Sequence, residues 1–569
     1  MKLTNPWVGY LTRSYQQIKK KLLERLVEKT PEITDHSESN PLIILLSMFA
    51  GLTEMLNYYI DNMAREAFLE SAREYESVVK LGKQIDYRIK PALSASADIK
   101  FSFLDGDDEL VELAEPFTIP AGIIVKTSNG VKFTTVEQIE VAAGESSVIV
   151  PTKQFTLVEG SILGETSNLA NQTYSLPTNY ADGNMQITIN DIAWEERNTL
   201  ALSAATDKHY VVTVNSSKIP YIQFGDGVYG AIPPSGFDVI ADYRITQGKI
   251  GNDLLEETIT ILESELTPPD GVTTISVTNK IKPNGGSDLE TIEQIRFRAP
   301  LSLRTLDTAK TYQDFKDLGI LAPGVSKVEL KFDIKRGITI YIVPEGGGIA
   351  SNSLIESTEE YFDEVRLVGT KKSVQAAGVD KVVCLIEAQA KFRKDPVQAA
   401  ADIVTAFKDH FSQENQDINK SVRISDLIAL IDNLEKIDFL SSFNFYINPY
   451  ARPLTPNENQ LDWDRETLTG STTKTIWRLR YLGSDEFRVI KNNTEIGTAT
   501  TSEEFSDGST FKFTINSSAG LASGDKWQFV VYPYNRDMVI EDFTIPEYDV
   551  ANSNIQVTAN NSITKNKVI

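Results

Sequence analysis

The chain has 569 residues, of which 41% are hydrophobic and 24% are charged, a globular composition that excludes collagen-like and globally disordered chains. Its 79 acidic and 56 basic residues give a formal net charge of −23, which repels nucleic acid phosphates and argues against DNA binding by the whole chain. At roughly 150 residues per domain, this length favours about four domains.

Targeting and redox signals are sparse. The segment Met1–Pro6 lacks the apolar core of a secretory signal. The most apolar stretch, Leu42–Leu52, is shorter than the roughly 20 residues that span a bilayer, so we expect no membrane insertion. Cys384 is the single cysteine, which rules out an internal disulfide and a cysteine-based zinc site. We expect it to be buried as a small hydrophobic side chain.

Residues 1–95 have the pattern of helices. Ile18, Leu22 and Leu26 recur every four residues, and Asn40-Pro41 has the form of a helix cap followed by proline at the first helical position. The next apolar series is denser than a helix with one face on a small core requires. It favours either a central core helix or a helix bundled with partner chains, through the candidate interface Leu42, Leu45, Leu46, Phe49, Leu52 and Leu56.

The following segments predict a multidomain α+β fold. Residues 96–283 alternate apolar and polar positions between turn signals, as expected of an all-β domain. Residues 284–452 alternate strands with short helices, which favours a ferredoxin-like α+β domain. Residues 453–569 predict a C-terminal β-sandwich followed by a tail from Met538. Trp477 and Trp527 fall on the apolar faces of their strands, where we expect core packing.

Catalytic and ligand-binding motifs are not evident. His36, His209 and His410 lie in three predicted domains and have no metal-ligand spacing. The run Gly346–Gly348 lacks the lysine and hydroxyl residue that end a phosphate-binding loop, so we interpret it as a loop before a helix. We therefore expect no catalytic residue, no cofactor and no bound metal.

A glycine-rich turn at residues 224–236 is the most distinctive local motif. Its glycines supply backbone angles that other residues resist, and its two prolines stiffen the exit. The residues that define it are Phe224, Gly225, Asp226, Gly227, Gly230, Pro233, Pro234 and Gly236. Taken alone, the motif predicts a structured loop without ligand chemistry.

This turn resembles a motif of the baseplate J-like family, the large wedge proteins of contractile-tailed phages and related contractile injection systems. Other segments occur in the order of that family, and the resemblance covers about residues 40–450. The chain departs from the family pattern at Asp253 and within Thr311–Phe315. The segments that carry the resemblance are Ile119–Thr127, Phe133–Thr135, Val141–Gly144, Tyr243, Gly248, Gly251, Asn252, Asn284–Glu290, Ala299-Pro300, Thr311–Phe315, Pro323–Val325 and Leu367–Thr370.

The resemblance implies a structural, non-enzymatic wedge subunit. Such a subunit would form the ring around the central hub of a contractile tail and would transmit the conformational change that triggers sheath contraction. Its implied partners are a second copy of itself, a different wedge chain, neighbouring wedges, and hub and sheath proteins, with no nucleic acid and no membrane insertion. It would reside in the tail baseplate of the virion after assembly in the cytoplasm of the host bacterium.

Two other classes of function stay open. The first is a tail-associated receptor- or glycan-binding protein, which the C-terminal sandwich with Trp477 and Trp527 would serve. The second is a tail-associated cell-wall hydrolase, against which the sparse histidines argue.

Overall fold

The computed structural model describes residues 14–559, apart from positions 86, 108, 184, 307, 334–336, 414, 455–460, 467–473, 507–510, 519–520, 522, 535, 539, 541–542 and 551. The fold is multidomain, with a few helices and many strands. The chain divides into two compact units. The first holds the residues up to Ser94, Phe155–Gly248 and Ser287–Asp307, and the second holds Ala95–Gln154, Lys249–Gly286 and Thr308 onward.

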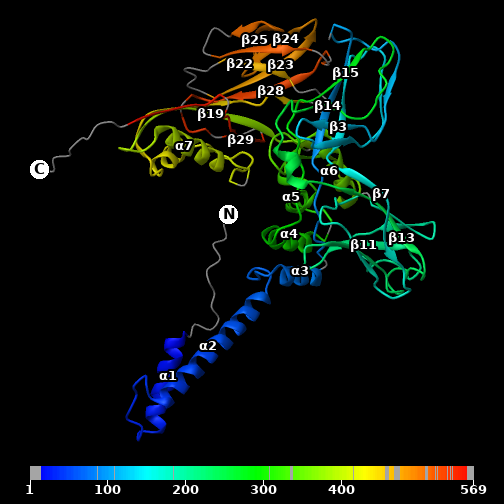
Figure 1. Cartoon of the computed structure of the whole chain (residues 1–569). Coiled ribbons are helices and arrows are strands. Elements are labelled where there is room, and N and C mark those ends of the chain that lie inside the picture. The colour runs from blue at the N-terminus through cyan, green and yellow to red at the C-terminus, as the bar shows by residue number, and fades with distance from the viewer. Residues whose placement is uncertain are drawn as a thin grey trace, which may run out of the picture. The chain divides into compact units, whose positions relative to one another are not determined.

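Helices α1 (Tyr15–Lys29), α2 (Pro41–Glu66), α3 (Tyr75–Gln84) and α4 (Ile292–Thr305) belong to the first unit. The α2 start at Asn40-Pro41 is confirmed, because the Asn40 side chain accepts the N–H of Leu42 at 2.9 Å. Helix α1 packs along α2 (Figure 1). Val78 and Val79 of α3 share a small core with Ile295 and Ala299 of α4.

The first unit also contains a seven-stranded sheet in the order β7-β13-β9-β10-β11-β12-β8. Its strands are β7 (Thr156–Glu165), β8 (Thr173–Ser175), β9 (Gln186–Ile189), β10 (Ile192–Glu196), β11 (His209–Val214), β12 (Pro220–Phe224) and β13 (Asp238–Ile245). Alternate residues face one core, which is why β11 shows strict alternation between half-buried and buried positions. Phe224, Tyr210 and Trp194 lie in that core.

A six-stranded sheet in the order β14-β3-β4-β6-β1-β15 begins the second unit. Its strands are β1 (Ser96–Leu104), β3 (Ile124–Thr127), β4 (Lys132–Thr135), β6 (Ser147–Lys153), β14 (Ile259–Leu262) and β15 (Thr274–Asn279), and β2 (Phe117–Ile119) pairs separately with β5 (Ile139–Val141). Ile99, Phe101 and Phe103 of β1 are buried as their alternation predicts. The predicted all-β segment 96–283 is therefore divided between the two units.

The α+β part of the second unit has two sheets where the sequence predicts one ferredoxin-like sandwich. One sheet has the order β16-β17-β18, and in the other β19 pairs with β20 on one side and with β29 and β30 on the opposite side. The elements are α5 (Tyr312–Leu321), β16 (Val325–Asp333), β17 (Gly337–Pro344), α6 (Asn352–Val365), β18 (Lys372–Ala376), β19 (Gly378–Ala390), α7 (Pro396–His410), α8 (Ile424–Asp432) and β20 (Ile437–Asn448). Cys384 is buried in β19 as predicted, and burial raises the pKa of its thiol.

A β-sandwich follows β20. One layer has the order β21-β28-β23-β24-β25 and the other β22-β27-β26. Their bounds are β21 (Arg452–Pro453), β22 (Asp462–Glu466), β23 (Thr475–Gly483), β24 (Glu486–Lys491), β25 (Thr494–Thr500), β26 (Glu504–Ser506), β27 (Lys512–Ser517) and β28 (Lys526–Val531). Trp477 and Trp527 are buried between the layers, which confirms their predicted core packing.

The segment after the sandwich is not a separate tail. Strands β29 (Thr544–Tyr548) and β30 (Asn554–Thr558) pair in parallel with β19, and Met538 and Ile540 lie in the same core as β19 and α7. The sequence assigned this segment to the sandwich end because strand pairing across so many residues leaves no local signal. Residues 560–569 of the predicted tail lie outside the described residues.

Candidate interaction surfaces

Helix α2 buries little of its apolar surface. Ile43 and Ala50 are its buried residues, and α1 is the described element that packs extensively on it. Ten large apolar side chains on the opposite side are between 47% and 74% exposed, and we call this set the uncovered face. Its members are Ile44, Leu45, Met48, Phe49, Leu52, Met55, Leu56, Tyr59, Ile60 and Met63.

The uncovered face is wide and continuous. At 3.6 residues per turn, its members occupy an arc of about 160° around the helix. Charged residues within this stretch, Glu54 and Asp61, fall outside the arc. Glu54 instead accepts the backbone N–H of Tyr15 in α1 at 2.9 Å. A stripe of roughly 100° suffices for one packing partner, so this arc has room for more than one.

The six leucine and phenylalanine positions predicted for a bundle interface divide into two groups. Leu45, Phe49, Leu52 and Leu56 belong to the uncovered face, whereas Leu42 and Leu46 are half-buried. The alternative of a central core helix is wrong for the described chain, because no described element other than α1 packs extensively on α2. A role for these residues in a bundle stays a prediction.

Helix α2 also passes a length and composition criterion for crossing a membrane. It spans 26 residues, and its most apolar window is 11% buried. The apolar stretch Leu42–Leu52 is shorter than this because it ends before Glu54, whereas the helix continues to Glu66. By length and composition alone, α2 is therefore a candidate span.

The glycine-rich turn is held by close backbone contacts within the first unit. Phe224 packs edge-on against Trp194, with ring centroids 5.0 Å apart. A Cβ on Gly225 would lie 2.3 Å from the backbone of Gly230, so only glycine fits there. Gly227, Gly230 and Gly236 have φ between +85° and +88°, which glycine adopts without strain.

Asp226 closes the tip of this turn. One of its carboxylate oxygens accepts the N–H groups of Val228 at 2.9 Å and Tyr229 at 2.7 Å. These two backbone hydrogen bonds lower the pKa of Asp226, so the carboxylate is ionised at neutral pH. At the exit of the turn, the carbonyl oxygens of Pro233 and Pro234 accept hydrogen bonds from the side chains of Gln172 and Thr166, respectively. Each motif residue thus has a structural explanation, and the family role of the motif stays a prediction.

One serine and histidine pair resembles part of a catalytic triad. Ser203 Oγ lies 2.8 Å from His209 Nδ1, and Glu195 Oε2 lies 3.6 Å from His209 Nε2. An oxyanion would need free N–H donors beside the serine. The N–H groups of Ser203 and Ala204 already donate to Leu200 O and Asp207 Oδ2. The pair therefore fixes a loop, and the described residues contain no group of three or more metal-ligating side chains placed for an ion.

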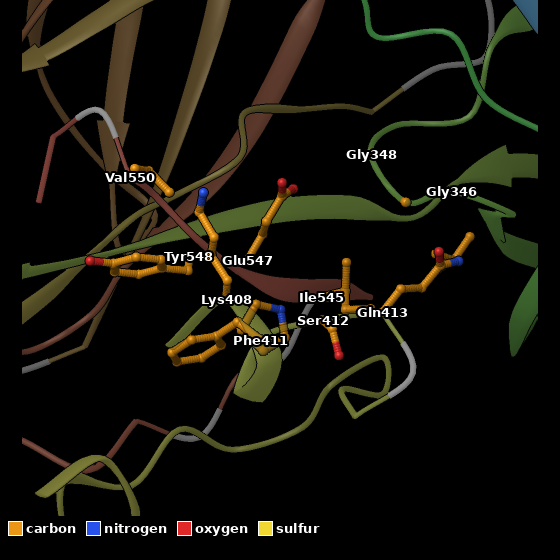
Figure 2. A pocket seen from close by; sticks show the side chains of 13 residues that line it. Gly346, Gly348, Lys408, Phe411, Ser412, Gln413, Ile545, Glu547, Tyr548 and Val550 are labelled. Atoms are coloured by element: carbon orange, nitrogen blue, oxygen red, sulfur yellow. The ribbon is translucent and has the colours of Figure 1, made fainter. Parts of the chain in front are cut away.

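A cavity of about 250 Å³ opens in the second unit between the Gly346–Gly348 loop, the end of α7 and β29 (Figure 2). Lys408 and Glu547 are its charged lining residues, and Phe411, Ile545 and Tyr548 supply apolar wall. Burial raises the pKa of Glu547. Gly346–Gly348 lies between β17 and α6, which confirms that the glycine run is a loop before a helix.

Comparison with known proteins connects the N-terminal helices to a function. Residues 14–84 match the family model described as bacteriophage baseplate protein, N-terminal domain. This range begins one residue before α1 and ends with α3, so it contains all of α2 and its uncovered face. The match covers the N-terminal helices and does not extend to the strands.

Structure comparison found a chain of the anti-feeding prophage baseplate, studied by cryo-electron microscopy with sixfold symmetry. The two chains share 12% identity over 75% of this chain and 86% of that chain, with a TM-score of 0.27. No curated protein matches. Because so low a TM-score does not establish a shared fold, the assignment depends on the family model. That model supports a structural role in a bacteriophage baseplate.

Proposed function

We propose that this chain is a structural wedge subunit of a contractile-tail baseplate, where it helps to form the ring around the central hub and transmits the rearrangement that triggers sheath contraction. One observation carries the proposal: the segment that matches a phage baseplate domain is the segment whose helix α2 leaves a wide apolar face uncovered. The finer assignment to the wedge draws on the resemblance of the glycine-rich turn and the segments around it.

The uncovered face supplies the physical reason for assembly. Burying one large apolar side chain fully stabilises a complex by about 1.5–3 kcal/mol, and ten such side chains lie together on α2. An arc of about 160° is wide enough to contact two neighbouring helices in a bundle. We assign these helices to a second copy of the chain and to a different wedge chain. Neighbouring wedges, hub and sheath proteins would contact other surfaces.

Helix bundling accounts for the helical pair better than membrane insertion. Helix α1 packs on α2 and carries many charged residues, which would have to enter the bilayer with it. These are Lys19, Lys20, Lys21, Glu24, Arg25, Glu28 and Lys29. No observation favours the receptor- or glycan-binding alternative, because the tryptophans that would support it are buried.

Electron microscopy tests the location of the chain. The affinity-tagged full chain, labelled with gold, is imaged in tail particles purified from the producing organism. We expect label at the distal end of contractile tails, in a ring around the tube. Label on fibres, or particles without label, would overturn the wedge assignment.

A pair of variants tests the uncovered face. Leu52→Asp places a charge in its centre, and Val397→Asp places one at a 76% exposed position of α7. We expect Leu52→Asp to reduce incorporation into tail particles at least about tenfold, since a lost buried contact of 1.4 kcal/mol or more has that effect. The Val397→Asp control should incorporate normally. Equal incorporation of both variants would contradict the bundle, and flotation of the purified chain with lipid vesicles would favour a membrane instead.

A further inference from the structure

Three loops meet at one end of the seven-stranded sheet in the first unit. They connect β7 to β8 (residues 166–172), β10 to β11 (197–208) and β12 to β13 (225–237). The sheet register brings them together: Glu165 pairs with Asp238, Tyr210 with Phe224, and Gln223 with Thr173. We call this surface the loop end.

Backbone hydrogen bonds join the three loops to one another. The Asn171 N–H donates to Gly225 O at 3.1 Å, and the Ala231 N–H donates to Asp207 O at 2.8 Å. The 197–208 loop is also fixed internally, because the Ala204 N–H donates to Asp207 Oδ2 at 2.8 Å and Ser203 contacts His209. The loop end is therefore preorganised, so a partner that binds it meets a small entropic cost of ordering.

Large apolar side chains from all three loops are exposed on this fixed frame. Leu169 is 65% exposed, Leu202 93%, Val228 64% and Tyr229 53%. Single exposed apolar residues are ordinary, but four of them on joined loops are typical of an interaction site. The contacts that hold the glycine-rich turn, between Gly225 and Gly230 and from Asp226, leave Val228 and Tyr229 at its tip.

Charge around the loop end selects the class of partner. Six carboxylate residues lie on the loops or within two residues of them, against two basic residues, Arg197 and Lys208; the six are Glu165, Glu195, Glu196, Asp207, Asp226 and Asp238. Arg197 already pairs with Glu195 at 2.9 Å. A symmetric contact with a second copy would place carboxylates opposite carboxylates, in a chain whose net charge is −23. A partner with basic residues around an apolar centre meets no such repulsion.

We propose that the loop end is a docking surface for a different protein whose contact surface combines an apolar centre with lysine and arginine side chains. Tyr229 is its anchor, because tyrosine is enriched among the few residues that carry most of the binding energy in protein interfaces. Leu202, which is 93% exposed, has the largest exposed fraction to bury on contact. This surface is separate from the uncovered face of α2, so it does not depend on the helix bundle.

Site-specific photocrosslinking tests the proposal in the full chain. A benzophenone amino acid replaces Tyr229 in the producing organism, and Tyr59 of the uncovered face is replaced in a parallel strain. After irradiation, the tagged chain is purified and crosslinked peptides are identified by mass spectrometry. We expect position 229 to crosslink to one other protein, in a segment of that protein whose neighbouring residues include lysine or arginine. In a Leu202→Asp background this crosslink should fall at least about tenfold, and in a Val397→Asp background it should persist.

The outcomes separate this surface from the helix bundle. A crosslink from position 229 to a second copy of the chain, or no crosslink there, overturns the docking surface. So does a crosslinked peptide without basic neighbours, or one that Leu202→Asp leaves unchanged. Position 59 reports on the uncovered face alone, so its crosslinks can persist when those at position 229 are lost.

Discussion

Helix α2 and the C-terminal sandwich both contain dense apolar sequence, yet they bury it differently. In the sandwich, Trp477 and Trp527 lie between two layers of strands that the same chain supplies. On α2, ten large apolar side chains face away from α1 and stay about half exposed or more. The sandwich completes its own core within a short stretch of chain, and α2 does not.

The two regions differ in how many of the neighbours that cover their apolar residues come from the same chain. A strand pattern with a period of two specifies one buried face, and a second sheet of similar pattern covers it. A helix with an uncovered apolar arc of about 160°, in addition to the side that packs on α1, needs several neighbours. The described chain supplies one of them, α1. The surplus apolar surface of α2 is therefore available to other chains, and that of the sandwich is not.

The largest effect should come from the sandwich. Trp527→Ala removes a fully buried side chain and leaves a cavity, so we expect a loss of about 3–5 kcal/mol in the free energy of unfolding of the isolated chain. Urea unfolding followed by tryptophan fluorescence and circular dichroism measures it. Ile476→Ala, at a partly exposed position of β23, is the matched control and should change little. A small loss for Trp527→Ala would mean that the sandwich also depends on partners.

The next largest effect should be the pH dependence of the free energy of unfolding that is due to Asp98 of β1. Its carboxylate accepts the Asn352 N–H at 2.8 Å, and its other oxygen has no hydrogen-bond partner in the described part of the chain. Burial, and then the neighbouring Glu356, raise its pKa to about 6 from 3.8. The raised pKa means that the folded state binds the proton of Asp98 more tightly than the unfolded state does. Protonation of Asp98 therefore stabilises the folded state. This contribution to the free energy of unfolding is complete below pH 3.8 and is lost as pH rises to 6.

The Asp98→Asn variant measures this contribution. In the natural chain, we expect the free energy of unfolding to fall by up to about 3 kcal/mol between pH 4 and pH 6. In Asp98→Asn, we expect this fall to be absent. Urea titrations at several pH values compare the two slopes, and Glu356→Gln serves as a control for the nearby carboxyl group. Parallel slopes for the natural chain and Asp98→Asn would show that Asp98 titrates normally.

The glycine-rich turn should show an intermediate effect. In Gly225→Ala the new Cβ overlaps the backbone of Gly230, so we expect a loss of about 1–3 kcal/mol in the free energy of unfolding. Ser235→Ala, at an exposed position of the same turn, should have almost no effect. A neutral Gly225→Ala variant would indicate that the turn rearranges easily and that the loop end is not preorganised.

The smallest effect on stability should come from α2. Leu52→Ala keeps a good helix former and removes a side chain that is already 56% exposed, so the isolated chain should lose less than about 0.5 kcal/mol. Sedimentation of tail particles should nevertheless show weaker incorporation. A loss of stability comparable to that of Trp527→Ala would place Leu52 in an internal core and would remove the contrast between the two regions.

Local structure was predictable wherever a short-range rule decided it. The cap at Asn40-Pro41, the alternation in β1 and the buried tryptophans follow from patterns within a few residues. The candidate interface was only partly predictable. Leu45 and Leu46 look alike in the sequence, but Leu45 is exposed and Leu46 is half-buried. Ile44, Met48 and Met55 were not singled out, although their spacing places them on the same side of the helix.

The sequence by itself determined the general features of the chain. It is large, acidic and multidomain, with an N-terminal helix that is more apolar than a small core requires, a glycine-rich turn and no recognisable catalytic motif. Periodicity and turn chemistry are local, so they can be read along the chain. Only the tertiary structure decided that β29 and β30 complete the β19 sheet, and that Leu169, Leu202 and Tyr229 come to one end of a sheet. Such pairings join residues far apart in the chain, and their stability depends on packing that no short stretch encodes.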